Sequence, residues 1–313
     1  MNKIVYMKFG SHLYGTETLE SDTDFKGIYM PTKREIYLGN FKSTISSSTG
    51  KQDSKNTAQD VDDEIFSLHQ FIKLACEGQT VAMDMLHAPK KMILESGLVW
   101  ENLVANRHRF YTKNLNSFVG YCKKQAAKYG IKGSRIAEVQ TVVDFLGELN
   151  PESKLGEFWL MLPQGEHMSF LPADTENKRS IEMYQVCGKK FQPTVKVKYV
   201  LESLTIFLTE YGHRAKLAAR NEGIDWKAVS HAVRAAVQLK EIYEHNTITF
   251  PLKSAKLIKD IKQGRLDYTR IVAPMLEELI ESVETLSNES TYPERVDREY
   301  WDDFLVAVST IIK

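Results

Sequence analysis

The feature that most constrains this chain is a Gly-Ser pair that follows a short apolar segment and precedes two closely spaced aspartates. Residues 3–9 are rich in apolar side chains and predict a β-strand, which runs into Gly10 and Ser11. After a spacer come Asp22 and Asp24, which predict two carboxylates on one side of a second strand, because side chains alternate along a strand. Carboxylates held side by side repel each other unless a cation lies between them. The pattern therefore predicts a strand, a tight turn and a second strand arranged around a cation.

Each part of this pattern has a use in phosphate chemistry. Gly10 allows a tight turn and a close approach of the backbone to a ligand. The Ser11 hydroxyl and neighbouring backbone N–H groups can hold phosphate oxygens, and Mg²⁺ with a nucleoside triphosphate is the usual occupant of paired carboxylates. A third carboxylate on a neighbouring strand would complete a two-metal phosphoryl-transfer site. Taken alone, Asp22 and Asp24 also fit ordinary capping of a turn by aspartate.

Length and charge limit the number of domains and the class of protein that this chain can be. The chain has 313 residues, which predicts two domains, and its 41 Lys and Arg residues balance 41 Asp and Glu residues. It is therefore not a globally basic nucleic-acid-binding protein, and any contact with nucleic acid must be local. The three scattered cysteines argue against a disulfide framework or a zinc site and fit a reducing cytoplasm. We find no signal-peptide pattern and no apolar run of about 18 residues, so we expect a cytoplasmic protein without a membrane span.

The periodicity of the rest of the chain predicts an α+β fold. Alternating side chains predict further strands over residues 24–30 and 60–66, and residues 155–192 predict a short β insert among helices. The polar segment 43–59 predicts either a mobile loop over the site or a loop tip with no role. Helices are expected over residues 68–77, 81–87, 115–128, 134–149, 195–221, 226–245, 254–262, 267–286 and 298–312.

Two segments of the chain resemble a known family. The string from Gly10 to Tyr29 joins Gly-Ser, Tyr-Gly and Ser-Asp-Thr-Asp, and it is similar to the signature of the polymerase-β-like nucleotidyltransferase superfamily. More narrowly, it resembles the RlaP-type predicted nucleotidyltransferases that are associated with RNA ligases. The late segment 223–234, with its histidine and arginine, resembles the same family, and Phe250-Pro251-Leu252 and Ile261-Lys262-Gln263-Gly264 continue the likeness.

The resemblance implies a domain organisation. Residues 1–110 would form a small mixed-sheet nucleotidyltransferase catalytic domain. Residues 111–313 would form a mainly helical domain that binds substrate and nucleotide and carries the short β insert near residues 155–192.

The resemblance also implies the metal ligands. It carries them over to Asp22 and Asp24, and the spacing ahead of the next helix favours Asp62 as the third catalytic carboxylate, with Glu64 as the second choice. Strand alternation places Asp62 and Glu64 on one face and Asp63 on the other. These strand acids also fit a row of solvated charges beside a strand.

A late cationic helix supplies the predicted nucleotide ligands. Lys227, His231 and Arg234 share one helix face at positions i, i+4 and i+7. Such a stripe is most often a solvated face, but the resemblance implies that Lys227 and Arg234 contact phosphates and that His231 donates or accepts a hydrogen bond. Gly10 and Ser11 would hold the β- and γ-phosphates. Basic residues that would extend this surface are Lys132, Arg135, Arg214, Lys216 and Arg220.

These observations lead to two functional hypotheses. The resemblance implies an enzyme that uses Mg²⁺ or Mn²⁺ to move a nucleoside monophosphate from a nucleoside triphosphate, with ATP as one candidate, to a hydroxyl acceptor, with RNA or tRNA favoured, and that releases pyrophosphate. The alternative is a non-catalytic nucleotide-sensing or antitoxin-like binding module on the same fold. A decayed module would lose one of the acids, and here they are all present. A haloacid-dehalogenase phosphatase also uses Asp-x-Asp, but residues 19–21 do not form the apolar strand that it requires.

Overall fold

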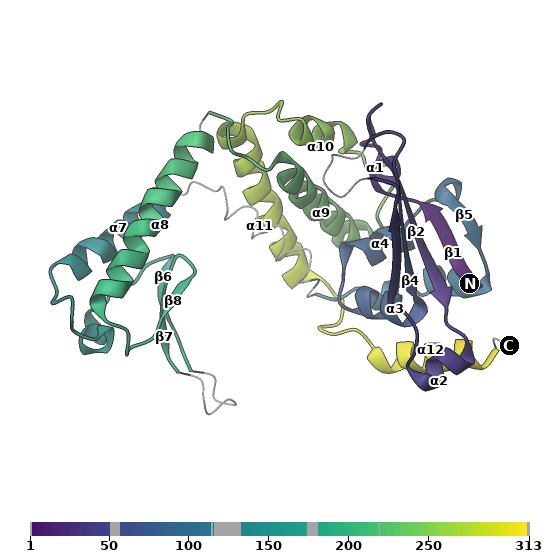
Figure 1. The fold of residues 1–313 in the computed structure, drawn as a ribbon, viewed down its shortest axis with the longest axis horizontal. Coiled ribbons are helices and arrows are strands. Elements are labelled where there is room, and N and C mark those ends of the chain that lie inside the picture. The colour runs from purple at the N-terminus through teal and green to yellow at the C-terminus, as the bar shows by residue number, and fades with distance from the viewer. Residues whose placement is uncertain are drawn as a thin grey trace. The chain divides into compact units, whose positions relative to one another are not determined.

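A mixed five-stranded sheet is the framework of the N-terminal half in the computed structural model, which describes residues 2–50, 57–113, 115, 133–173, 181–218 and 220–311. The strand order is β3-β4-β2-β1-β5 (Figure 1). Strands β2 and β4 are parallel, and the other neighbours are antiparallel. The strands span Asn2–Lys8 (β1), Thr23–Met30 (β2), Thr44–Ser48 (β3), Val61–Ser67 (β4) and Ile93–Ser96 (β5).

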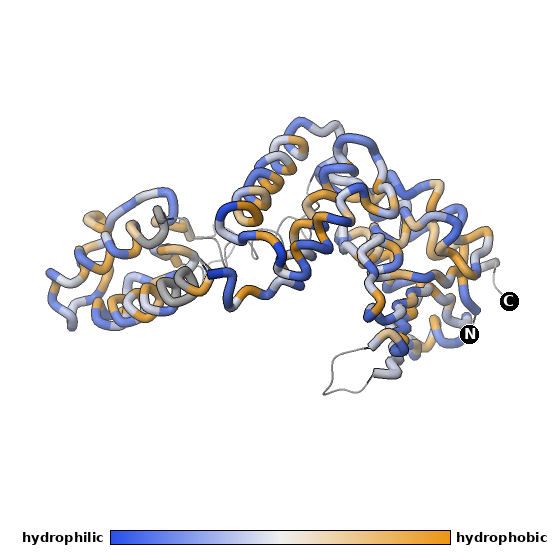
Figure 2. Tube along the Cα trace, turned by 90° about the horizontal axis from the view of Figure 1, so that it is seen from above, coloured by the Kyte–Doolittle hydropathy of each residue, from blue (hydrophilic) through white to orange (hydrophobic). Residues whose placement is uncertain are grey.

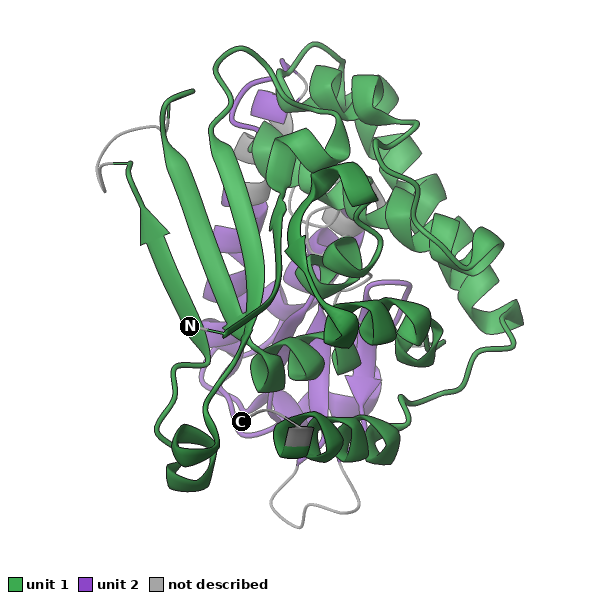
Figure 3. Cartoon of the chain, turned by 90° about the vertical axis from the view of Figure 1, so that its right-hand side faces the viewer, with its two compact units in different colours: residues 1–128, 225–313 green, residues 129–224 purple. Residues whose placement is uncertain are grey.

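Short helices follow β1, β2, β4 and β5 in the chain. Helix α3 begins where the Ser67 hydroxyl accepts a hydrogen bond from the backbone N–H of Gln70 at 3.2 Å, and it buries Leu68, Phe71 and Ile72. Helices α3 and α4 lie on one face of the sheet (Figures 1 and 3). The helices of this part span Gly10–Tyr14 (α1), Lys33–Leu38 (α2), Leu68–Cys76 (α3), Thr80–Leu86 (α4) and Leu98–Ala105 (α5).

The C-terminal helices belong to the same compact unit as the sheet. That unit comprises residues 1–128 and 225–313 (Figure 3). Helix α9 begins at Asp225, whose carboxylate accepts a hydrogen bond from the backbone N–H of Ala228 at 2.9 Å. Orange and blue segments alternate along these helices in Figure 2, as expected for amphipathic helices with one buried face. They span Trp226–His245 (α9), Ala255–Lys262 (α10), Ala273–Glu289 (α11) and Arg298–Ile311 (α12).

The second compact unit comprises residues 129–224. Its elements are α7 (Gly133–Gly147), β6 (Met168–Leu171), β7 (Met183–Val186), β8 (Lys189–Phe191) and α8 (Val197–Ala218). The three strands form an antiparallel sheet in the order β6-β7-β8. The unit has its own apolar core, whose fully buried members include Val139, Val142, Tyr184, Val186, Val197, Val200 and Leu204.

The predicted α+β class and the short β insert are confirmed, and two local predictions are wrong. Residues 44–48, predicted as part of a mobile loop, form the edge strand β3, because backbone pairing with β4 does not require apolar side chains at an exposed edge. Residues 158–162, an apolar run at the start of the predicted β insert, belong mostly to a 3₁₀ helix over Leu155–Met161. In that helix only Leu155 is buried and Leu160 is almost fully exposed, so an unbroken apolar run does not mark a buried strand here.

The described residues do not test the predictions of a helix over residues 115–128 and of a domain boundary near residue 110. Of the helix predicted over residues 115–128, only residue 115 is described. Lys132 also lies outside the described residues. The domain boundary near residue 110 stays a prediction, because compact units defined by contacts are not the same as domains that fold alone. Among the described residues, no helix is both long enough and apolar enough to span a membrane.

Candidate active site

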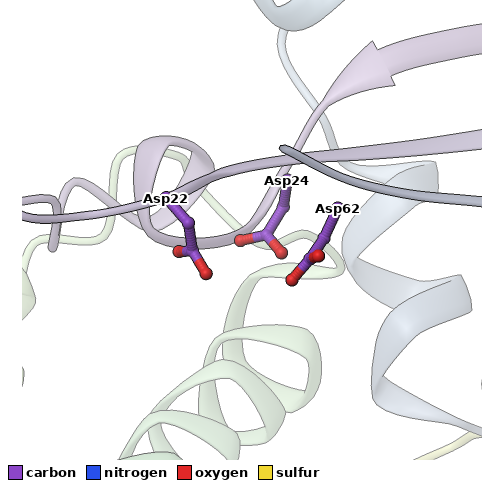
Figure 4. A group of neighbouring side chains, drawn as sticks. All are labelled: Asp22, Asp24 and Asp62. Carbon is purple, nitrogen blue, oxygen red and sulfur yellow. The ribbon is translucent and has the colours of Figure 1, made fainter. Parts of the chain in front are cut away.

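Three aspartates come together at the start of β2 and β4. Asp22 immediately precedes β2, Asp24 is the second residue of β2, and Asp62 is the second residue of β4. The parallel register pairs Asp24 with Asp62, so their side chains project from the same face. One carboxylate oxygen from each of the three residues lies within 4.8 Å of the other two, and Figure 4 shows the carboxylates pointing to one side of the strands. This arrangement is compatible with metal binding.

The acids that flank Asp62 in the sequence have other partners. Asp63 projects from the opposite face, where its carboxylate accepts a hydrogen bond from the Tyr6 hydroxyl at 3.2 Å. Burial and the Asp63 charge raise the pKa of Tyr6 to about 12. Glu64 forms an ion pair with Lys26 at 2.7 Å, and Asp60 accepts hydrogen bonds from the backbone and hydroxyl of Thr57. The structure therefore brings Asp62, and not Glu64, to Asp22 and Asp24.

Like charge is concentrated in this triad of carboxylates, Asp22, Asp24 and Asp62. Burial raises the pKa of Asp24, and the charges of Asp22 and Asp62 raise it further. Lys26 and His12 act in the opposite direction but do not offset these effects. A bound cation would relieve this repulsion, so the electrostatics fit the metal that the carboxylates could hold.

The turn that leads into α1 lies directly against the Asp24 carboxylate of the triad. Gly10 has a φ of +61°, and a Cβ built there would lie 1.8 Å from the Asp24 carboxylate oxygen Oδ2. The backbone N–H of Phe9 also donates to the carbonyl of Asp24 at 2.8 Å. Within the described part of the chain, the Ser11 hydroxyl and His12 Nε2 are buried without a hydrogen-bond partner. The turn thus places two buried polar atoms next to the triad, where a ligand oxygen could engage them.

Arg234 lies in a buried network rather than on a solvated face. Its Nη1 donates to the Asp84 carboxylate at 2.9 Å, and its guanidinium lies 3.9 Å from the centre of the Tyr14 ring. Asp84, which is fully buried, also accepts hydrogen bonds from the Tyr14 hydroxyl at 2.8 Å and from Gln238 at 2.7 Å. Burial alone would lower the pKa of Arg234, but Tyr14 and Asp84 raise it, so the guanidinium stays charged. The network joins α1, α4 and α9.

The other two predicted residues of α9 have different environments. Lys227 is exposed, whereas His231 is half-buried. Burial, followed by the charges of Arg234, Lys227 and Lys262, lowers the pKa of His231 to about 4. His231 is therefore neutral at pH 7 and can donate or accept a hydrogen bond. Of the other predicted basic residues, Arg220 is exposed, and the side chains of Arg135, Arg214 and Lys216 lie outside the described atoms.

The sequence did not predict a role for five residues of this region, which are His12, Tyr14, Lys26, Asp84 and Gln238. Lys26 could have been found, because strand alternation places it on the same face as Asp24. His12 follows Ser11 directly and carried no separate signal. Asp84 is a lone charge in an apolar helix, which is a sign of a buried partner, but nothing local points to Arg234, which lies 150 residues away, or to Tyr14.

The chain is similar to a known protein family and to a phage protein. Residues 2–145 match the model of the family described as RlaP, the RNA repair pathway DNA polymerase beta family. An uncharacterised 38.9 kDa protein from the nrdC–mobD intergenic region of Enterobacteria phage T4 is 40% identical over 327 residues. That alignment covers 98% of this chain and 97% of the phage protein. No solved structure matches the chain.

Replacing Gly10 by alanine should disrupt the triad. The new Cβ would collide with the Asp24 carboxylate, and the positive φ would add strain of about 1–2 kcal/mol. Gly39 is a matched control, because it has the same φ of +61° and open space around its Cβ position. We expect Gly10→Ala to lose more unfolding free energy than Gly39→Ala in urea denaturation and to weaken Mn²⁺ binding in titration calorimetry. Equal effects of the two substitutions would contradict this role of Gly10.

Replacing Asp24 by asparagine should stabilise the metal-free protein at neutral pH. The pKa of Asp24 is raised above its ordinary value of 3.8, so folding favours its protonated form. That contribution to stability is complete below pH 3.8 and is lost as the pH rises through the raised pKa. Asparagine removes the charge, and Asp63→Asn, on the opposite face, is the control. Thermal unfolding in EDTA at pH 7 should give a higher midpoint for Asp24→Asn alone, and an unchanged or lower midpoint would contradict this account.

Replacing Arg234 by alanine should destabilise the fold. It leaves the buried Asp84 carboxylate without its counter-charge, which costs about 3–5 kcal/mol in comparable cases. Lys227→Ala, on the same helix but exposed, should leave the unfolding free energy nearly unchanged. Urea denaturation of both variants measures the difference. Similar unfolding free energies for the two variants would show that the ion pair does not hold α9 in place.

Proposed function

The chain belongs to the RlaP, RNA repair pathway DNA polymerase beta family, and from that premise we propose that it is a metal-dependent nucleotidyltransferase. Membership of a polymerase-β-like family suggests nucleotidyl transfer as the type of chemistry. The proposed reaction moves a nucleoside monophosphate from a nucleoside triphosphate to a hydroxyl acceptor and releases pyrophosphate.

The observation that carries this proposal is the triad of carboxylates. Three acids from the paired starts of β2 and β4 converge on one point, and their electrostatics favour a cation there. The runner-up hypothesis, a non-catalytic sensing or antitoxin-like module, does not require such a set. No observation specifically favours that hypothesis.

We assign the metal to Asp22, Asp24 and Asp62, with Mg²⁺ or Mn²⁺ as the ion, because hard cations prefer carboxylate oxygens. When bound, the ions would neutralise charge on the phosphate oxygens and increase the acidity of the attacking hydroxyl. The three aspartates fit a divalent cation, because the Asp24 carboxylate is crowded by like charge and lacks sufficient counter-charge from Lys26 and His12.

The chain's own residues bind and orient the substrate. Gly10 and Ser11 are proposed to hold the β- and γ-phosphates, with the buried Ser11 hydroxyl and His12 Nε2 as hydrogen-bonding groups. The acceptor oxygen forms its bond to the α-phosphorus as the bond to pyrophosphate breaks, and Asp62 takes up the hydroxyl proton. Positioning and charge compensation are thus the main contributions of the protein.

Helix α9 contributes in two ways in this proposal. Exposed Lys227 and neutral His231 remain candidates for contacts with phosphate or nucleotide. The guanidinium of Arg234 is engaged by Asp84, so its main contribution would be to hold α9 against Tyr14 of α1, and its direct contact with phosphate stays a prediction. RNA or tRNA as acceptor, ATP as nucleotide and a cytoplasmic location are also predictions.

A transfer assay tests the proposal. Purified protein is incubated with each α-³²P-labelled nucleoside triphosphate, with Mg²⁺ or Mn²⁺, and with RNA or tRNA. The expected result is label in the nucleic acid and release of unlabelled pyrophosphate, both abolished by EDTA and by Asp24→Asn. The absence of labelled product with every nucleotide and with host RNA or protein extract would favour the non-catalytic module.

Two neighbouring residues of β4 provide a matched pair of variants. Asp62→Ala should lower the rate of nucleotidyl transfer by at least about 10²-fold, because it removes a ligand of the proposed metal. Asp63→Ala should change the rate little, because Asp63 faces Tyr6 on the other side of the sheet. Initial rates under saturating nucleotide measure both. If Asp63 proved essential and Asp62 dispensable, the metal would have to bind on the opposite face of β4, which would contradict the proposed site.

A further inference from the structure

Positive charge is concentrated on α10 and its flanks, in a chain that is neutral overall. The segment from 253 to 265 contains five basic residues and one acid, Asp260. Among the described residues, Asp260 forms an ion pair with Arg265 at 3.2 Å, and no ion pair is formed by Lys256, Lys259 or Lys262. Since the whole chain has 41 basic and 41 acidic residues, this surplus is local.

These three lysines, which we call the α10 lysine row, form a line along the helix. Residues three apart are neighbours on a helix surface, so Lys256, Lys259 and Lys262 follow one another on one side. Ile258 and Ile261 are buried on the other side. Lys256 and Lys262 are exposed and Lys259 is half-exposed, so the row is directed to solvent.

The start of the row adjoins the helix that begins at the triad. A Cβ at Gly15, the residue that ends α1, would lie 3.5 Å from the Cβ of Ala255. The backbone N–H of Leu252 donates to the carbonyl of Tyr14 at 3.1 Å. The first turn of α10 is therefore fixed against α1, whose first residues lie at the triad.

The far end of the row reaches α9. Helix α10 packs against α9. The charge of Lys262 is also one of the causes of the lowered pKa of His231. Lys227, one turn before His231, is exposed on the same helix. A line of cations thus extends from the neighbourhood of α1 to the N-terminal part of α9.

From this placement we infer that the α10 lysine row binds the phosphates of a single RNA strand, which would lead toward the triad. Successive lysines of the row rise about 4.5 Å along the helix axis, so the row presents cations at regular intervals. A regular line of cations matches the repeating charges of a polynucleotide better than the compact charge of one triphosphate. The inference rests on the proposed function and deepens it by assigning a surface to the RNA acceptor, but the binding itself does not depend on catalysis.

A binding measurement without nucleotide or metal tests the inference. The probe is a fluorescein-labelled, single-stranded RNA of mixed sequence, and the readout is fluorescence anisotropy in EDTA over a series of salt concentrations. The test variant is Lys256→Gln/Lys259→Gln/Lys262→Gln. The matched control is Lys73→Gln/Lys90→Gln/Lys91→Gln, which removes the same charge from three exposed lysines elsewhere in the same unit.

The expected result is a loss of RNA affinity of at least tenfold for the test variant and less than twofold for the control. The slope of log affinity against log salt should also fall in magnitude by about 2, as expected for three lost phosphate contacts with a single strand. Thermal unfolding of both variants should match the wild type, because the substituted side chains lie on the surface.

The outcomes separate this inference from the proposed function. Equal RNA affinities for the test variant and the control would overturn the inference, whether or not the wild type transfers a nucleotide. A test variant that loses affinity for ATP in the presence of Mn²⁺ but keeps its affinity for RNA would also overturn it, and would assign the row to the triphosphate. A specific loss of RNA affinity in a protein that transfers no nucleotide would support the inference and contradict the proposed function.

Discussion

The crowding of three carboxylates at the start of β2 and β4 is the constraint around which the N-terminal half is arranged. Because the two strands are parallel and pair Asp24 with Asp62, the charges face one side and repel each other. The surroundings accommodate this repulsion without removing it. Lys26 and His12 supply partial counter-charge, and Gly10 has no Cβ where the Asp24 carboxylate lies. The sheet register, the tight turn and the basic neighbours therefore form one arrangement that favours a cation.

A second arrangement joins the two ends of the chain. The buried ion pair between Asp84 and Arg234 links residues 150 positions apart, and Tyr14 and Gln238 complete its hydrogen bonds. A buried charge is tolerated only when it is paired and hydrogen-bonded, so these contacts hold α9 and α4 against α1. The sheet and the C-terminal helices consequently form one unit, although residues 129–224 separate them in the sequence.

Although the net charge of the whole chain is zero, acidic and basic side chains gather on different elements of this unit. Acids gather at the starts of β2 and β4, and cations gather along α10 and at the N-terminal part of α9. The proposed nucleotidyl transfer would use both, because a metal site requires carboxylates whereas a nucleotide and the proposed RNA acceptor carry phosphates. The segment that leads into α10 is hydrogen-bonded to α1 through Leu252 and Tyr14, and a Cβ at Gly15 would lie within 3.5 Å of the Ala255 Cβ. The acidic and the basic residues are therefore linked through helices that lie against each other.

The sequence by itself determined the features that depend on local order. Strand alternation and the Gly-Ser turn predicted the strands around Asp22 and Asp24, and alternation also separated Asp62 from Asp63, because side-chain direction along a strand depends only on position. The tertiary structure decided what depends on pairing between distant segments. It placed Asp62 beside Asp24 rather than leaving Glu64 as an alternative, because the register of two strands is set by their packing. It also turned Arg234 from a residue of a cationic helix face into a buried partner of Asp84, because helical periodicity shows which residues share a face but not what that face contacts.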